Sequence, residues 1–407
     1  MKPIVRFDHN SREYGRNWRA INDRLRSECP VGWSESHGGF WVVTRHRDVA
    51  EIARDDATFS SAFANGGVLI PPSPSAALPI MMDPPEFYTI RRLLNPWFSP
   101  ARMVRWEARI LEWTTQALDA HVESGAIDFV MDLGNLVPGK FTVSVLGLPI
   151  QDWFAYAEPQ HLIVSYPTPG EGDPHRARMH AKALAGQRWC VEEILKLIPK
   201  RRADPQDDLI SFLATADAGG RRLTDEEISG TALLVLAGGV DTTTALLACA
   251  LLHLHEHADD RQRLIEQPAL IGPATEEFLR YYSIVQGLAR TVMRPVEIGG
   301  QPMAPGERVF ISWASANFDP EAFDEPDRFI LDREPNRHST FGLGIHRCLG
   351  SSFARMEFRI MLEQILKRMP DFSIDVAACE PYEAIANANG YVSMPGRFSP
   401  GPRIGGA

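Results

Sequence analysis

Residues 341–350 read Phe341-Gly342-Leu343-Gly344-Ile345-His346-Arg347-Cys348-Leu349-Gly350 and place one cysteine in a glycine-rich loop with little charge. An amphipathic run follows at 351–367 and predicts a helix. Cys348 therefore lies just before a helix N-terminus, where backbone N–H groups and the positive end of the helix dipole favour a thiolate. A thiolate can bind a soft or borderline metal ion, and the glycines let the backbone approach a flat ligand closely.

A lone cysteine is more often a small buried apolar residue than a ligand, so its neighbours must decide. Phe341 can pack on a macrocycle face, His346 can contact an anionic edge group, and the Gly350 amide can hydrogen-bond to sulfur. The pattern F-G-x-G-x-H-x-C-x-G resembles the haem-binding loop of the cytochrome P450 family. The resemblance implies haem b with Cys348 as the axial iron ligand, and with Phe341, Gly342, His346 and Gly350 against the cofactor.

Bulk composition bounds the class of protein. The chain has 407 residues, 44% of them hydrophobic, which suffices for a large core, and we expect one domain over 1–407. A formal net charge of −10 argues against a nucleic-acid surface. Five scattered cysteines favour a reducing compartment. The first residues form no signal peptide, and the longest apolar stretch, 232–252, is interrupted by glycines and polar residues, so we expect a cytoplasmic protein without membrane association.

The predicted secondary structure is mainly α with a minor β region. Helical periodicity covers 47–54, 91–98, 103–123, 176–198 and nearly all of 207–282. Strand patterns occur at 41–44, 296–309 and parts of 371–407. Two aperiodic segments, 65–79 and 167–174, predict loops.

A long apolar helix is predicted in the middle of the chain. Thr224 and Glu227 form a capping-box pattern, and the helix runs to about residue 257, which is about 50 Å. Its centre contains Gly238-Gly239 followed by Asp241-Thr242. One interpretation is a helix–helix contact that needs glycine, with threonines bonding to the preceding turn. The other is a widened turn that admits a ligand, with polar groups that handle protons.

This central segment, 237–242, is similar to the oxygen-activation segment of the P450 family. The resemblance implies that Gly238 makes room at the haem, that Thr242 hydrogen-bonds to bound dioxygen, and that Asp241 relays protons from solvent. The chemistry asks for these residue types, because splitting dioxygen requires two protons. A hydroxyl positions them without competing as a metal ligand, and a carboxylate can shuttle them.

Further charged residues match family positions. Glu277 and Arg280 are spaced i,i+3, which is usually a solvated ion pair. Their position before the segments 316–320 and 323–329 resembles the buried Glu–Arg pair that supports the haem loop. Arg91, Arg290 and His346 match the groups that hold the haem propionates. The chain departs from the family pattern at Phe87, where a histidine is common, and Tyr88 is a candidate replacement.

Substrate and partner are less well encoded. By resemblance, the pocket is lined from the regions 63–78, 161–169, 234–238, 285–288 and 391–393, which are mainly apolar. The pocket residues we predict are Leu234, Val235, Val285, Gln286, Leu288 and Val392. A group of arginines could dock an acidic electron-transfer protein, although scattered surface charge is the alternative reading of each. They are Arg91, Arg92, Arg102, Arg105, Arg347, Arg355 and Arg359.

Taken together, the resemblance implies a monomeric haem-thiolate monooxygenase that inserts one oxygen atom of O2 into a C–H bond of a small to medium apolar substrate. The reaction is hydroxylation, or O-dealkylation by the same step. Electrons would come ultimately from NAD(P)H through a separate ferredoxin-like or flavodoxin-like protein. The alternatives are a peroxygenase driven by hydrogen peroxide, which usually lacks an acid–threonine pair such as Asp241-Thr242, and a non-catalytic haem sensor.

Overall fold

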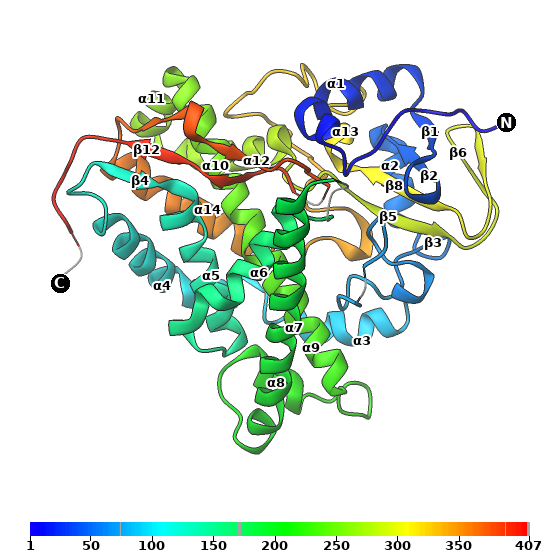
Figure 1. Cartoon of the computed structure of the whole chain (residues 1–407), viewed down its shortest axis with the longest axis horizontal. Coiled ribbons are helices and arrows are strands. Elements are labelled where there is room, and N and C mark those ends of the chain that lie inside the picture. The colour runs from blue at the N-terminus through cyan, green and yellow to red at the C-terminus, as the bar shows by residue number, and fades with distance from the viewer. Residues whose placement is uncertain (74, 169–171, 387, 405–407) are drawn as a thin grey trace.

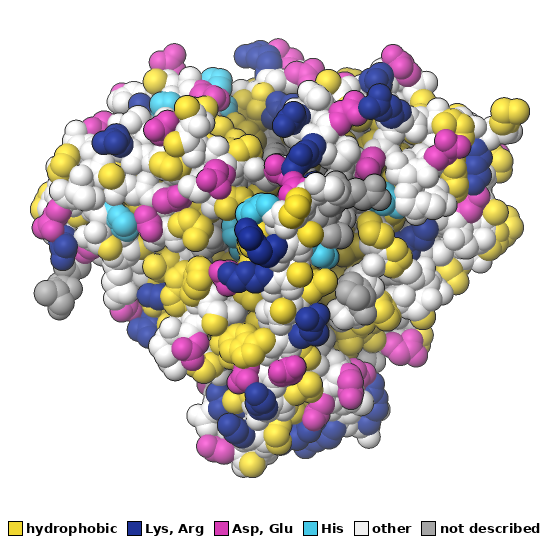
Figure 2. All heavy atoms as spheres, viewed as in Figure 1, with side chains coloured by type: hydrophobic (Ala, Val, Ile, Leu, Met, Phe, Trp, Pro, Cys, Tyr) yellow, Lys and Arg dark blue, Asp and Glu magenta, His cyan; other side chains and the backbone are white. Residues whose placement is uncertain are grey.

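The computed structural model describes residues 1–73, 75–168, 172–386 and 388–404. Figure 1 shows a large helical part and a smaller part built around strands, in which the N-terminal strands lie beside strands from the last third of the chain. This arrangement confirms the predicted mainly α fold with a minor β region. Over the face drawn in Figure 2, Lys and Arg side chains are mixed with Asp and Glu, without a continuous basic patch.

The α-helices occupy nearly half of the chain. They are α1 (Arg12–Glu28), α2 (His46–Arg54), α3 (Glu86–Leu94), α4 (Pro100–Asp119), α5 (Leu136–Leu146), α6 (Trp153–Ser165), α7 (Pro174–Ala203), α8 (Leu209–Thr215), α9 (Asp225–Gly239), α10 (Asp241–Glu256), α11 (Ala258–Glu266), α12 (Ile271–Tyr282), α13 (Trp313–Ala316) and α14 (Ser351–Arg368).

The strands form four small sheets among the described residues. The strands are β1 (Val31–Ser34), β2 (Phe40–Val43), β3 (Phe59–Ser60), β4 (Ala126–Asp128), β5 (Gly287–Val292), β6 (Val296–Ile298), β7 (Gln301–Met303), β8 (Arg308–Ser312), β9 (Ser373–Ile374), β10 (Glu380–Pro381), β11 (Tyr391–Ser393) and β12 (Pro395–Arg397). The largest sheet has the order β1-β2-β8-β5-β3, with β2 and β8 parallel and its other pairs antiparallel.

The predicted central helix is interrupted. It consists of α9 and α10, which meet at Val240 (φ −87°, ψ −66°). The interruption has a local cause, because two glycines weaken the helix and the Thr242 hydroxyl donates to the Gly238 carbonyl at 2.9 Å. A Cβ on Gly239 would lie 2.6 Å from the Thr142 Oγ1 of α5. Gly239 therefore allows a close helix contact, as the first interpretation requires. Gly238 is exposed, and its role in admitting a ligand stays a prediction.

The start of this helix pair follows the predicted pattern. Thr224 caps α9, and Thr224 and Glu227 form the reciprocal capping box. The stretch Asp225–Glu256 is long and apolar enough to cross a membrane, but 67% of its most apolar window is buried inside the protein. It is therefore accounted for as a core element.

Helices α1, α5 and α6 were not predicted, and α3 begins at Glu86 rather than near residue 91. Helix α5 contains Pro138, Gly139 and several β-branched residues, all of which lower intrinsic helix propensity. Tertiary packing overrides that preference, because most of α5 is buried. Gly139 is needed for this packing, since a Cβ there would lie 2.6 Å from the Trp153 ring of α6.

Replacing this contact glycine should cost stability. Gly139→Ala inserts a methyl group against the Trp153 ring, and we expect the free energy of unfolding to fall by about 1–3 kcal/mol. Gly272→Ala in α12 is the control, because no atom would lie within 4 Å of the new Cβ. We expect the control to change stability by between zero and about +1 kcal/mol. Urea unfolding of both variants measures this, and equal stability in the two would contradict the packing argument.

Candidate active site

The cysteine loop is shaped by its own backbone. The Cys348 N–H donates to the Phe341 carbonyl at 2.7 Å and closes the loop. Gly342 and Gly344 have φ of 70° and 71°, in the left-handed region that favours glycine. At Gly344 glycine is also required sterically, because a Cβ would lie 2.1 Å from the carbonyl oxygen of Ala53 in α2. The loop is thereby held against α2, and α14 starts directly after Gly350.

Cys348 as a residue is exposed, but enough of the chain surrounds its sulfur to desolvate a thiolate there. Desolvation by the surrounding chain raises the pKa of its thiol, while the Gly350 N–H and the cations Arg91 and Arg347 oppose that rise. The Gly350 N–H at the helix N-terminus thus lowers the pKa of Cys348, but it does not outweigh desolvation. A bound metal cation would supply the remaining stabilisation of the ionised sulfur.

Three basic groups converge beside the cysteine. Arg290 on β5 is buried, and burial followed by the nearby Arg308 charge lowers its pKa to about 10. Arg91 on α3 donates to the Arg347 carbonyl of the cysteine loop at 2.7 Å. Burial and the charges of Arg290 and Arg91 lower the pKa of His346 to about 3.

This cluster fits the carboxylates of a haem. Among the described residues, both ring nitrogens of His346 are buried and have no hydrogen-bond partner. Burial without a partner is costly for a polar group. An anionic group placed between His346, Arg290 and Arg91 would satisfy the imidazole and offset the positive charge that the two guanidinium groups place beside it.

Phe87 changes the character of this cluster. Its ring is 1% exposed, and its centroid lies 4.5 Å from the His346 ring at 59°. Tyr88 does not take over the position, because its side chain is exposed and lies under the Arg92 guanidinium at 5.5 Å. Phe87 thus supplies an apolar contact that orients His346 where a histidine could have supplied a hydrogen bond.

The other predicted catalytic residues lie at the junction of α9 and α10. Thr242 is partly exposed, and Gly238, one turn before it, is exposed. Asp241 is 0% exposed and has no direct contact with solvent. A proton relay from solvent through Asp241 would therefore need at least one further group. The Oδ1 of Asp241 lies 2.7 Å from Nδ1 of His161 on α6, and the Tyr382 hydroxyl donates to both carboxylate oxygens at 2.8 and 2.9 Å.

Comparison with known proteins identifies the family. The model of the family described as Cytochrome P450 matches residues 140–272 and 273–377. This chain belongs to the cytochrome P450 family.

Curated relatives and solved structures agree with this assignment. A steroid C26-monooxygenase of Mycolicibacterium smegmatis is 33% identical over 378 residues, which is 92% of this chain and 91% of the relative. A linalool 8-monooxygenase of Pseudomonas putida is 33% identical over 368 residues, covering 86% and 88% of the two chains. The crystal structure of CYP109E1 from Bacillus megaterium in complex with testosterone has a TM-score of 0.85 at 31% identity, covering 95% of this chain and 99% of that one. The chain is therefore a P450-type monooxygenase, an oxidoreductase.

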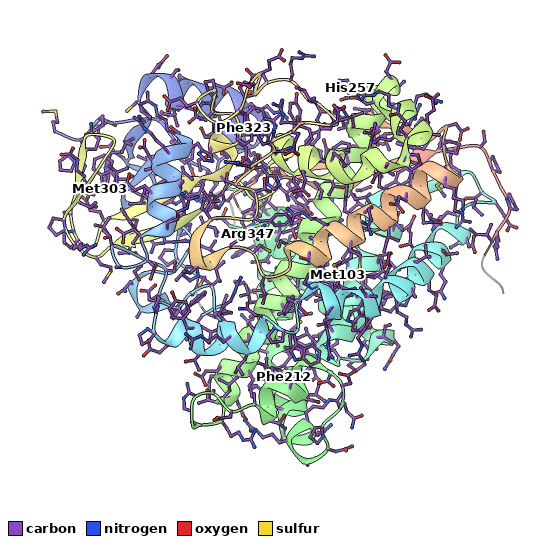
Figure 3. The ribbon with its side chains drawn as sticks, turned by 180° about the vertical axis from the view of Figure 1, so that it is seen from behind. Met103, Phe212, His257, Met303, Phe323 and Arg347 are labelled. Atoms are coloured by element: carbon purple, nitrogen blue, oxygen red, sulfur yellow. The ribbon has the colours of Figure 1, made fainter. Side chains whose placement is uncertain are left out.

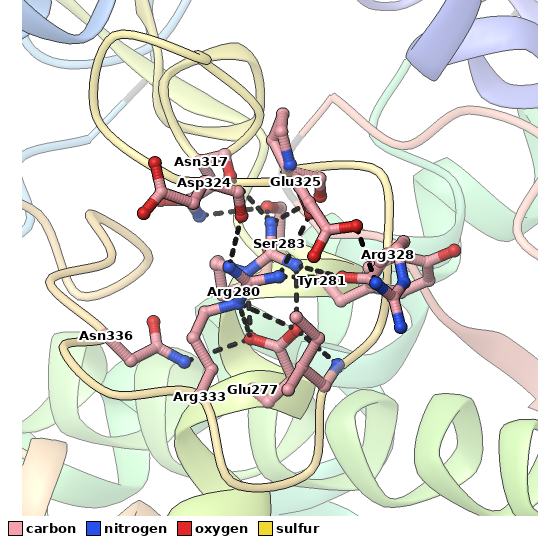
Figure 4. Close-up of polar contacts among 12 residues, drawn as sticks. Glu277, Arg280, Tyr281, Ser283, Asn317, Asp324, Glu325, Arg328, Arg333 and Asn336 are labelled. Carbon is pink, nitrogen blue, oxygen red and sulfur yellow. Dashed lines mark hydrogen bonds and ion pairs between the residues drawn. The ribbon is translucent and has the colours of Figure 1, made fainter.

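The Glu277–Arg280 pair of this P450 is fully buried and belongs to a larger network (Figure 4). Arg280 donates two hydrogen bonds to the Glu277 carboxylate, each 2.8 Å long. Arg333 donates to the same carboxylate at 3.1 and 3.2 Å, and so do the Ile330 N–H and the Asn336 amide. Arg333 was missed in the sequence, where only its position after the 323–329 segment could have suggested it.

The predicted pocket residues do not all fit that role. Leu234, Val235, Val285, Leu288 and Val392 are partly exposed, as lining residues should be. The prediction for the sixth residue, Gln286, was wrong.

Gln286 is 0% exposed and serves the interior of the protein instead. Its amide donates to the Ser283 carbonyl at 2.7 Å and accepts from the Tyr14 hydroxyl at 3.2 Å. Two positions of the predicted lining regions, Pro74 and Pro169, lie outside the described residues.

The buried network predicts a large effect of removing its charge. Glu277→Gln leaves two buried guanidinium groups without their counter-charge, and we expect the free energy of unfolding to fall by about 3–5 kcal/mol. Urea unfolding is the measurement. Glu325→Gln is the control, because the Glu325–Arg328 pair has the same i,i+3 spacing with side chains 57% and 66% exposed. There we expect a loss below about 1 kcal/mol. Similar losses in both variants would exclude a special role for the buried pair.

Proposed function

We propose that this P450 uses haem b to insert one oxygen atom of O2 into a C–H bond of a small to medium apolar substrate, by hydroxylation or O-dealkylation. The observation that carries the proposal is the convergence of a loop cysteine with two arginines and an unpartnered histidine. The thiol suits the iron of a haem, and the cluster that selects carboxylates suits its propionates.

The iron and the propionates of the haem each have proposed partners. Cys348 binds the iron, and Arg91, Arg290 and His346 hold the propionates. Phe341 packs on the macrocycle, while Gly342 and Gly350 let the loop backbone lie close to it. When bound, the haem supplies the chemistry that cleaves dioxygen, promoted by electron density from the thiolate.

The protein contributes proton handling at the α9–α10 junction. The Thr242 hydroxyl donates to Gly238 and is partly exposed, so it can accept a second hydrogen bond from the reaction space. Asp241 follows Val240 in the same turn and carries a buried carboxylate, which can take up and release a proton. We propose that Asp241 and Thr242 deliver the protons that dioxygen cleavage consumes.

The substrate is proposed to be a terpenoid or steroid-like molecule. The partly exposed pocket residues Leu234, Val235, Val285, Leu288 and Val392 are all aliphatic, and a pocket of that kind binds apolar ligands. Relatives named for steroid and linalool oxidation support the same class.

Electrons are proposed to come from NAD(P)H through a ferredoxin-like or flavodoxin-like protein that docks near Arg347. Figure 3 shows Arg347 in the cysteine loop at the start of α14, on the face opposite that of Figure 1. Several of the other predicted docking arginines are paired within the chain. Asp207 binds Arg102 and Arg105, and Glu276 binds Arg355. Fewer arginines are therefore available to a docking partner than the sequence suggests.

We also propose that the protein is a cytoplasmic monomer.

The iron ligand can be tested by spectroscopy. The carbon monoxide complex of the reduced protein should absorb far to the red of an imidazole-ligated haem, because Cys348 would bind the iron as a thiolate. Cys348→Ala should lose this band. Cys379→Ala is the control, since Cys379 is also free and partly exposed. A red-shifted band that persists in Cys348→Ala would refute the assignment.

The role of Thr242 can be tested by measuring coupling, which is the share of reducing equivalents that ends in product. Thr242→Ala should divert reducing equivalents to hydrogen peroxide and lower product formation by about tenfold or more, because a proton-positioning group is lost. Thr242→Ser keeps the hydroxyl and should restore coupling. Turnover with peroxide alone that equals turnover with reductant and O2 would favour the peroxygenase alternative.

Substrate class can be tested by titration. Steroids and monoterpene alcohols that displace water from the iron should shift the Soret band of the protein. Long-chain fatty acids of similar carbon number are the comparison set. A response to the fatty acids alone would contradict the proposed class.

A further inference from the structure

The carboxylate of Asp241 is enclosed by side chains from two distant parts of the chain. His161 lies on α6, and Tyr382 follows β10. The exposed fractions are 0% for Asp241, 4% for Tyr382 and 6% for His161, so all three side chains are buried and His161 is the most exposed residue of the cluster. Among the described residues, Asp241 forms an ion pair with His161 and with no lysine or arginine.

The hydrogen bonds define the donors. An ionised carboxylate only accepts hydrogen bonds, so the 2.7 Å contact between His161 Nδ1 and Asp241 Oδ1 requires a proton on Nδ1. The second ring nitrogen, Nε2, is buried and has no partner within the described part of the chain. One nitrogen of His161 therefore serves Asp241, while the other, although buried, lacks the partner that a buried polar atom needs and is suited to bind a water molecule.

Tyr382 has a different part in the cluster. Its hydroxyl donates to both oxygens of Asp241, at 2.8 and 2.9 Å. Burial and the charge of Asp241 raise the pKa of the Tyr382 phenol well above its ordinary value. Tyr382 thus stays a donor that holds the carboxylate in place, and it is a poor source of protons.

Resting on the proposed monooxygenase function, we propose that His161 is a positioning residue that feeds protons to Asp241. In this step Nε2 takes a proton from a hydronium ion, which becomes water. The Nδ1–H bond breaks, an O–H bond forms on Asp241, and the ring keeps its remaining proton on Nε2. The imidazole is left neutral and no electrons are exchanged. The net result is transfer of one proton from solvent to a carboxyl group that solvent does not reach directly.

An imidazole suits this position better than a permanent cation. Arginine would hold the carboxylate ionised through a strong charge-assisted pair and could not release a proton. Histidine offers a donor at one nitrogen and an exchange site at the other. The same contact can therefore both orient Asp241 and reload it.

The decisive variant is His161→Asn. The asparagine Nδ2 can replace Nδ1 as a donor to Asp241, but an amide cannot pass on a proton. We expect the reduced carbon monoxide spectrum and the substrate-induced Soret shift to stay as in wild type. Product formation with reductant and O2 should fall about tenfold or more, with a larger solvent isotope effect. His161→Asn turnover within about twofold of wild type would overturn the proposal.

A second measurement, by NMR, does not depend on the enzymatic activity of any variant. In the diamagnetic reduced carbon monoxide complex, ¹⁵N-histidine NMR should show one histidine protonated at Nδ1 with a far-downfield N–H, absent in His161→Asn and shifted in Tyr382→Phe. A wild-type His161 that carries its proton only on Nε2 would overturn the proposal even if the variants fail to fold. A wild-type protein that lacks the red-shifted carbon monoxide band would instead refute the proposed function, so the two failures are distinguishable.

Discussion

The buried carboxylate of Glu277 is the constraint on which the rest of the haem-side structure depends. It lies on α12 with no exposed surface and accepts hydrogen bonds from Arg280 and Arg333 together. Removing three charged groups from water is expensive, and a buried charge is tolerated only when its pairing and its hydrogen bonds are complete. Completion here requires the segment from 317 to 336 to fold over α12 in one arrangement, because that segment supplies the remaining partners.

The same constraint reaches the cysteine loop through a short chain of contacts. Arg280 donates to the Asn317 carbonyl at 3.0 Å, and the Asn317 side chain accepts from the Ser339 N–H at 2.7 Å and donates to Thr340 at 2.9 Å. The Gly342 N–H then donates to the Ser339 carbonyl at 2.7 Å. The loop that presents Cys348 is therefore built on a network whose first charges lie about 70 positions earlier in the chain, so that stability and cofactor geometry are coupled.

Sequence reasoning succeeded where the signal is local. Glycine spacing, the Thr224–Glu227 capping box and the cysteine loop each depend on neighbours a few positions apart. It failed where a residue acquires its role from a distant partner. Tyr382 lies 141 positions from Asp241, and nothing around it in sequence marks it as a hydrogen-bond donor to that carboxylate. Gln286 was misplaced for the same reason, because its side-chain partner Tyr14 lies 272 positions away in the sequence.

The two histidines of the site show how neighbours assign different tasks to one side chain. His346 faces the guanidinium groups of Arg290 and Arg91 and an apolar Phe87 ring, so its surroundings lack negative charge and suit an anionic ligand. His161 faces a carboxylate, so its surroundings already contain the acceptor for its Nδ1 proton. Because an imidazole can donate from one nitrogen while the other accepts, the first arrangement favours holding a ligand and the second favours moving a proton.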